Sequence, residues 1–132
     1  MDAVSHRKRA AGALVVTDTV ALLAFVVVGV LDHGGTLGVG PLVRNAVPIL
    51  GAWLGAAAVL GTYREGGLGR LAATWAAAVP AGVALRGLWL GRDFGTGFLV
   101  FTGVALSFTL LFLVAGRLVL LGLARGRRAV LR

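Results

Sequence analysis

Four long apolar stretches, separated by short glycine-rich connections, dominate the pattern of hydrophobic and polar positions. They cover about residues 12–31, 42–61, 70–90 and 97–124. A helix that crosses a bilayer needs roughly 20 mostly apolar residues at a rise of about 1.5 Å each. Each stretch meets that length, and the connections are long enough for antiparallel hairpins. The pattern predicts an all-α bundle of four transmembrane helices, forming one integral membrane domain over residues 1–132.

Composition supports the membrane class. Hydrophobic residues make up 58% of the chain and charged residues 14%, whereas a soluble domain averages roughly 25% charged. The absence of cysteine excludes disulfides and thiolate metal sites. The formal charge of +8 comes from residues at helix ends, not from a basic stripe interleaved with aromatic side chains. The expected partner is therefore the lipid bilayer and not nucleic acid, and no metal site is predicted.

The distribution of basic residues predicts the orientation of the helices, because cytoplasmic loops carry an excess of Lys and Arg. Ten lie on the side of the two termini and the second connection: Arg7, Lys8, Arg9, Arg64, Arg70, Arg117, Arg125, Arg127, Arg128 and Arg132. Three lie on the other side: Arg44, Arg86 and Arg92. Both termini are expected in the cytoplasm, with the protein in the cell membrane. The first stretch is longer than the apolar part of a signal peptide and lacks a cleavage motif, so it is expected to be retained.

An aspartate lies inside the first stretch, in VVTDTVALLAF. Asp18 follows about six residues of apolar helix, roughly 9 Å by helical rise. An isolated charge there costs a few kcal/mol, so a partner is expected. Arg117 lies at the same cytoplasmic level of the fourth stretch. Alternatives remain: Asp18 bonds locally to neighbouring threonines, Arg117 reaches the lipid headgroups, or the pair is purely structural.

A second polar layer is predicted at the outer end. Arg86 lies there with Asp32, His33, Arg44 and Asp93. A guanidinium keeps its charge, so it needs acceptors in an apolar span, and the available carboxylates are those of Asp32 and Asp93. His33 would tune this layer as it titrates, or it is an ordinary loop histidine. In a purely structural reading, Arg86 links the outer ends of the first and third spans.

Helical phase predicts which faces point inward. Residues three or four positions apart share a face, which groups Asp18 with Asp32 on the first span and Trp75 with Arg86 on the third. Other residues mark bends and packing: Pro48 and Pro80 inside spans, the small-residue pair Gly51 and Gly55, and Trp53 as a core residue. The small residues suggest a contact face for a homo-oligomer, most simply a dimer.

A spaced set of residues along nearly the whole chain resembles a known family. The set comprises Asp18, Phe25, Gly29, His33, Pro48, Gly51, Trp53, Trp75, Gly82, Arg86, Phe98, Phe101 and Arg117. It is similar to the small archaeal and actinobacterial membrane proteins grouped as domain of unknown function 3054. The resemblance implies the four-helix layout and draws attention to the polar positions. It implies no activity.

Three classes of function are compatible with these residues. The favoured class is a homo-oligomeric transporter or channel for a small solute, because buried Asp and Arg layers lie at both ends of one face; ligand binding is the alternative. A protein that holds an apolar ligand, such as a quinone, carotenoid or lipid, is favoured by the aromatic middle. An enzyme is the least favoured, because the chain offers no catalytic constellation: no cysteine, no paired carboxylates and no phosphate-binding loop with its lysine.

Overall fold

The computed structural model describes residues 2–130, so Arg132 lies outside the described part. Its helices are α1 (Asp2–Asp32), α2 (Val39–Leu60), α3 (Thr62–Glu65), α4 (Leu68–Trp89) and α5 (Thr96–Val130). The four long helices form a bundle, and each is long and apolar enough to cross a membrane. The predicted all-α architecture is therefore confirmed.

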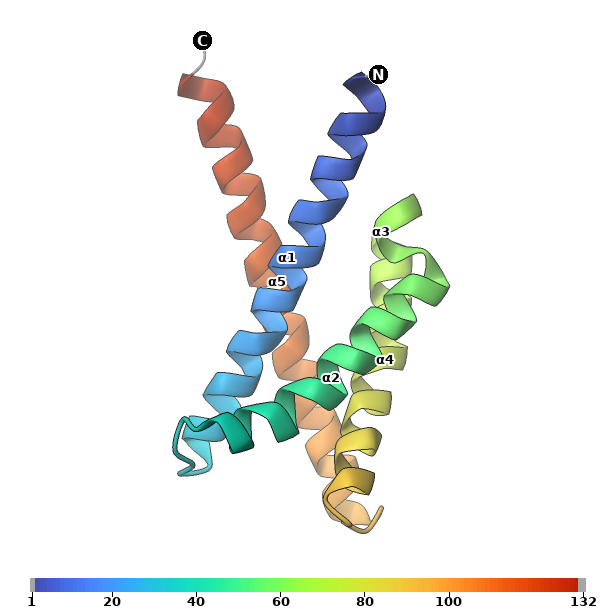
Figure 1. Ribbon diagram of the computed structural model, residues 1–132, viewed down its shortest axis with the longest axis vertical. Helices are drawn as coiled ribbons and strands as arrows, with labels where there is room; N and C mark the ends of the chain where they lie inside the picture. The colour runs from blue at the N-terminus through green and yellow to red at the C-terminus, as the bar shows by residue number, and fades with distance from the viewer. Residues whose placement is uncertain (1, 131–132) are drawn as a thin grey trace.

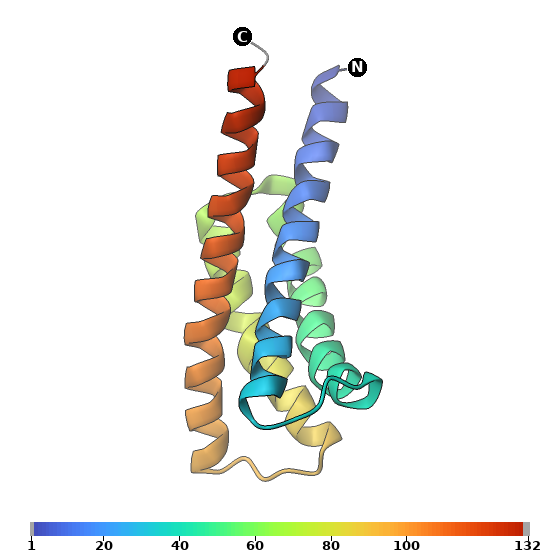
Figure 2. The ribbon, with the colours of Figure 1, turned by 90° about the vertical axis from the view of Figure 1, so that its left-hand side faces the viewer.

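Two of the long helices, α1 and α5, extend well beyond the apolar stretches that predicted them. The basic segment before the first stretch is helical from Asp2 onward, since it contains no proline and no glycine until Gly12. Both termini lie at one end of the bundle, where α1 and α5 project past α3 (Figures 1 and 2). The α1–α2 and α4–α5 connections lie together at the opposite end, here called the hairpin end.

The second glycine-rich connection, residues 62–69, contains the short helix α3. Gly61 ends α2 in the left-handed conformation at φ 65°, which suits a residue without a Cβ. The amides of Arg64 and Glu65 then donate to the Gly61 carbonyl at 3.1 and 2.9 Å, forming the short helix α3. Arg70 pairs with Glu65 and donates to the Leu60 carbonyl at 2.5 Å. The connection is thereby folded against the bundle.

In the bundle, each long helix packs against two of the other three. α1 packs on α2 and α5, and α4 packs on the same two helices. Among the described residues, the backbones of α1 and α4 do not approach closely, and neither do those of α2 and α5. The interior facing all four helices therefore holds only side chains and cavity.

Two glycines set the closest helix contacts. A Cβ built on Gly82 of α4 would lie 2.9 Å from the Ile49 Cα of α2. A Cβ on Gly116 of α5 would lie 3.2 Å from the Thr17 Cγ2 of α1. In contrast, Gly51 and Gly55 are exposed with no atom in reach of a Cβ. Close packing within the chain thus uses Gly82 and Gly116, and the Gly51–Gly55 face is left on the outside of α2.

The two prolines inside the helices are accommodated without breaking them. Pro48 is buried in α2, and α2 bends along its course in Figure 1, as expected when a proline removes a backbone hydrogen bond. Pro80 is half-buried in α4, which continues unbroken to Trp89.

Candidate functional site

The predicted partnership of Asp18 and Arg117 is present. Nε of Arg117 donates to Asp18 Oδ1 at 3.1 Å, and Nη2 donates to Oδ2 at 2.7 Å. This two-pronged geometry matches the fork of a guanidinium to a carboxylate. Asp18 has no exposed surface, whereas the Arg117 side chain is 23% exposed. The pair joins α1 to α5 near the point where Gly116 lets these helices touch.

Two further side chains complete this cluster, and neither was predicted to belong to it. The Tyr63 hydroxyl of α3 donates to Asp18 Oδ2 at 2.8 Å, and Trp53 Nε1 of α2 donates to the Tyr63 oxygen at 2.8 Å. Burial raises the pKa of the Tyr63 phenol well above its usual value, so it stays a proton donor. Asp18 accepts three hydrogen bonds, two from Arg117 and one from Tyr63.

We refer to Asp18, Arg117, Tyr63 and Trp53 as the inner cluster. It ties together α1, α5, α3 and α2 through four hydrogen bonds. Within the described residues, every buried side-chain nitrogen and oxygen has a hydrogen-bond partner. The buried polar atoms of the inner cluster are therefore satisfied within the protein, while Arg117 keeps 23% of its side chain exposed.

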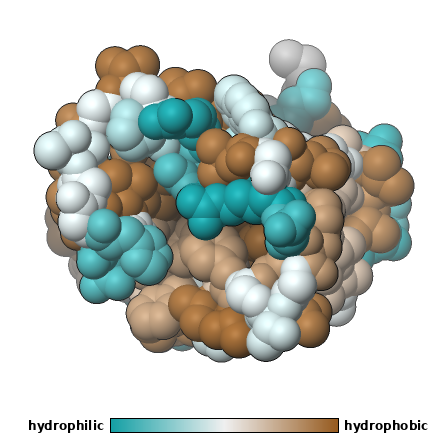
Figure 3. All heavy atoms as spheres, turned by 90° about the horizontal axis from the view of Figure 1, so that it is seen from below, coloured by the Kyte–Doolittle hydropathy of each residue, from teal (hydrophilic) through white to brown (hydrophobic). Residues whose placement is uncertain are grey.

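A cavity of about 380 Å³ lies at the hairpin end of the bundle. All four long helices line it, and most of its lining is apolar, including Phe25, Phe101 and Phe108. Figure 3 views the molecule from this end and shows hydrophilic side chains around a recess in a largely hydrophobic surface. The volume falls within the roughly 300–1,000 Å³ typical of ligand pockets.

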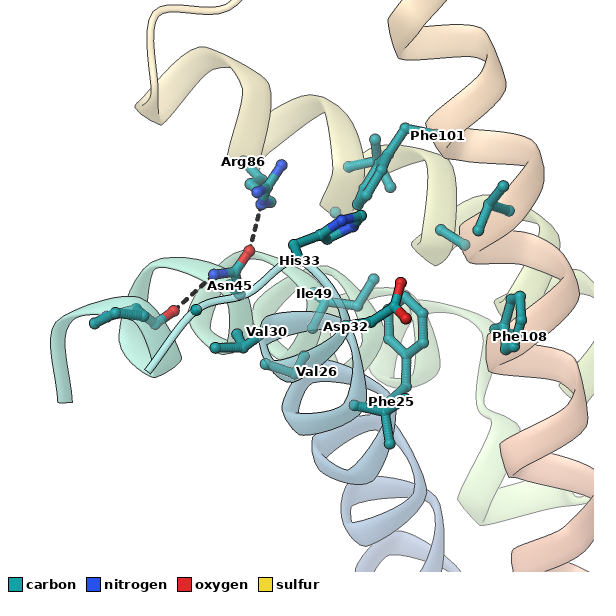
Figure 4. Close-up of a pocket in the computed structure, with 18 residues that line it drawn as sticks. Phe25, Val26, Val30, Asp32, His33, Asn45, Ile49, Arg86, Phe101 and Phe108 are labelled. Atoms are coloured by element: carbon teal, nitrogen blue, oxygen red, sulfur yellow. Dashed lines mark hydrogen bonds between the residues drawn. The ribbon is translucent and has the colours of Figure 1, made fainter. Parts of the chain in front are cut away.

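The polar end of the cavity is built around Arg86, in the last turn of α4. Its Nε donates to the side-chain oxygen Oδ1 of Asn45 on α2 at 2.5 Å, and its guanidinium carbon lies 5.1 Å from the centre of the Phe101 ring. Asn45 is held in turn, because its amide nitrogen donates to the Pro41 carbonyl at 2.7 Å. Figure 4 shows this chain of contacts.

The expected acceptors of Arg86 were wrong. Neither Asp32 nor Asp93 forms an ion pair with it in the described structure; the neutral Asn45 takes that place. The reading in which Arg86 links the first and third spans also fails, since its bond runs to α2. Asn45 is the acceptor because α2 packs directly against α4. Asp32 lies on α1, which is diagonal to α4 in the bundle.

The remaining outer residues divide into two groups. Asp32 and His33 line the exposed mouth of the cavity, where His33 lies between Arg86 and Asp32 in the view of Figure 4. Asp93 and Arg44 are exposed and are not among the lining residues. The outer polar layer is therefore smaller than the sequence predicted.

A layer of fully packed side chains separates the cavity from the inner cluster. Leu22, Val79 and Leu113 are at most 2% exposed, and the Trp53 ring is fully buried beside them. Trp75 flanks this layer, and its Nε1 donates to the Leu106 carbonyl at 3.1 Å and to Thr109 Oγ1 at 3.2 Å. The cavity is closed on the side of the termini.

Candidate metal ligands do not gather in this part of the protein. Over residues 2–130, no group of three or more His, Cys, Asp or Glu side chains lies close enough to hold a metal ion. The cavity is thus described by one guanidinium, one amide, a rim of Asp32 and His33, and apolar walls.

Comparison with known proteins identifies the family of this chain. The family model described as "Protein of unknown function (DUF3054)" matches residues 15–120. The chain belongs to the DUF3054 family. The matched region includes every residue of the inner cluster and of the cavity. No curated protein and no solved structure matches the chain.

Proposed function

We propose that this DUF3054 protein binds one amphiphilic molecule within the membrane, with its apolar body in the cavity and its polar head at Arg86. The observation that supports this proposal is the cavity itself. Its walls are aromatic and aliphatic, and the guanidinium of Arg86 lies at its polar end. Ligand sites are mostly apolar with a few placed polar groups. A volume of about 380 Å³ suits a single-chain or small-ring molecule better than a two-chain lipid.

Transport of a small solute is the second candidate. It is favoured by polar groups at both ends of one bundle, the inner cluster and Arg86. It requires the packed layer of Leu22, Val79 and Leu113 to open, since these side chains are buried. Solute flux into protein-containing liposomes would support transport, and binding without flux would support the ligand-holding function.

Arg86→Lys tests the binding proposal, because lysine keeps the charge but loses the planar fork. Charge-assisted hydrogen bonds contribute roughly 1.5–3 kcal/mol each, so we expect affinity for single-chain amphiphiles to fall about tenfold or more while the fold is retained. Native mass spectrometry of the protein with oleate, oleyl alcohol and a short-chain quinone measures this.

Arg44→Lys is the matched control, as Arg44 lies at the same end but is exposed and outside the cavity lining. It should bind all three probes as the wild type does. If Arg86→Lys only lowers thermal stability and leaves probe binding unchanged, Arg86 is structural and the proposed site is wrong.

We also propose that both termini face the cytoplasm of a cell, with the hairpin end outside. The excess of Lys and Arg at the termini supports this orientation. The chain has no native cysteine, so single cysteines report cleanly on accessibility. Cysteines at Val4 and Ala129 should react only with cytoplasmic access, and one at Thr36 only from outside. Labelling of Thr36 and Val4 from the same side would refute this topology.

A homodimer is proposed as the assembled form. Gly51 and Gly55 support it, because they leave the outer face of α2 flat and exposed, and small residues let membrane helices approach closely.

A further inference from the structure

The cavity has an open side that its lining residues identify. The lining residues of α2 and α4 are buried or half-buried, whereas Val28 of α1 and Val104 and Phe108 of α5 are 46–47% exposed. Gly29 also lines the cavity, and a Cβ on it would meet no atom within 4 Å. Below their contact at Gly116, α1 and α5 diverge toward the hairpin end (Figure 1). The cavity therefore opens sideways between α1 and α5.

In a bilayer, this opening faces lipid. Val28, Val104 and Phe108 lie on helices apolar enough to span the membrane, so the slot between them is bordered by side chains compatible with acyl chains. Arg86 lies in the last turn of α4, within roughly 5 Å of the helix end by helical rise. A polar head at Arg86 is thus near the membrane–water interface, while the cavity body extends into the apolar region.

The electrostatic environment of Arg86 indicates the charge of the ligand's head group. Among the described residues, its guanidinium makes one hydrogen bond, through Nε to the neutral Asn45, and no ion pair. Its two terminal nitrogens have no acceptor within residues 2–130. A cation in an apolar environment is costly without a counter-charge, and paired terminal nitrogens match two oxygens of a carboxylate or phosphate. The contact with Phe101 positions the cation but does not neutralise it.

We propose that the ligand is a single-chain amphiphile with an anionic head, carboxylate or phosphate, that enters from the lipid through the slot between α1 and α5. This inference rests on the proposed function and specifies its ligand class and its route. Asn45 is a positioning residue, since its bond to Nε fixes the orientation of the Arg86 guanidinium at the cavity. Asp32, at the mouth, is separated from Arg86 by His33 in the view of Figure 4.

The test compares three head groups carried on the same 18-carbon hydrocarbon chain. The probes are oleate, oleoyl lysophosphatidate and oleyl alcohol, added at alkaline pH to wild-type protein in nanodiscs of neutral lipid, with bound probe measured by native mass spectrometry. Both anions should bind about tenfold or more tightly than the alcohol. Arg86→Gln should remove this preference by lowering the affinity for both anions toward that for the alcohol. The better of the two anions identifies a carboxylate or a phosphate head.

The route is tested separately with tryptophan substitutions. Val104→Trp obstructs the slot and should slow oleate uptake several-fold in a stopped-flow measurement. Val114→Trp is the matched control, because Val114 is 49% exposed on α5 but does not line the cavity; it should have no effect.

The outcomes separate the two levels of the proposal. Equal binding of anions and alcohol to the wild type would overturn the anionic head but leave the proposed function standing. Equal uptake rates for Val104→Trp and Val114→Trp would overturn the lateral route. Binding of none of the probes to the wild type would overturn the proposed function as well. The wild-type comparison needs no variant, so it decides the head even if Arg86→Gln fails to fold.

Discussion

Asp18→Asn is expected to destabilise the protein by about 3 kcal/mol or more, since removing one partner of a buried ion pair strands the other. The Arg117 fork would lose both charge-assisted bonds, at 3.1 and 2.7 Å, and Tyr63 would lose a charged acceptor. Arg117→Gln is expected to cost a similar amount, as it leaves Asp18 buried with only the Tyr63 donor. The measurement is the free energy of unfolding in mixed micelles, followed by tryptophan fluorescence.

The double variant decides whether the two residues act together. Asp18→Asn with Arg117→Gln should cost less than the sum of the single changes, with a coupling of about 1–3 kcal/mol. Asp32→Asn and Arg125→Gln are matched controls, since both residues are exposed, and neither should change stability measurably. Additive effects of the single changes at positions 18 and 117 would show that the ion pair contributes nothing to stability.

Tyr63 contributes to the same cluster through a weaker interaction. A typical hydrogen bond contributes roughly 0.5–1.5 kcal/mol, or 1.5–3 kcal/mol when one partner is charged. The Tyr63 contribution is therefore smaller than that of the ion pair, and α3 is held to the bundle partly by this one hydroxyl.

The helices were predictable because their signal is a matter of length and composition. Four apolar stretches in a chain that is 14% charged leave the backbone few alternatives to helices in a bilayer. The helix ends were less predictable, since no apolar boundary marks where a helix stops in water. α1 begins at Asp2 and α5 continues to Val130, well past the apolar residues.

The Asp18–Arg117 pair was predictable for a simple reason. Antiparallel helices of known order place residues at calculable depths, and a buried carboxylate demands a cation at its own depth. The same reasoning failed for Arg86. Depth in the membrane pointed to Asp32 and Asp93 as partners of Arg86. Which helices are neighbours depends on the packing, however, and in the structure Arg86 bonds to Asn45 on the adjacent helix α2.

Tyr63 was missed because its position depends on a turn. It is the only tyrosine of the chain and follows an apolar stretch, which is a signal that it has a special environment. The sequence does not show that Gly61 and the bonds of Arg70 fold α3 back so that the Tyr63 hydroxyl reaches Asp18. The cavity was not predicted either, because it depends on how the helices pack: it is the space left where α1 and α5 diverge.

Gly82→Val is expected to have the second large effect. A Cβ at this position would lie 2.9 Å from the Ile49 Cα and 3.3 Å from the Pro48 carbonyl oxygen. The nearest atom belongs to the backbone, so it cannot turn aside as a flexible side chain does. Overpacking typically costs about 1–3 kcal/mol, and we expect the upper part of that range or a failure to fold. Thermal unfolding of the purified protein measures it, with Gly82→Ala as the milder step.

Gly55→Val is the matched control on the facing helix. It carries the same side chain on a transmembrane helix, but nothing lies within 4 Å of its Cβ, so the unfolding temperature of the monomer should not fall. If Gly55 lies in the proposed dimer interface, this variant should instead shift the protein from dimer to monomer in size-exclusion chromatography with light scattering. Equal thermal destabilisation by Gly55→Val and Gly82→Val would show that close contact at Gly82 is not what orders α2 against α4. We expect the two variants to differ, because Gly82 lies at a close contact between α4 and α2, whereas Gly55 faces outward.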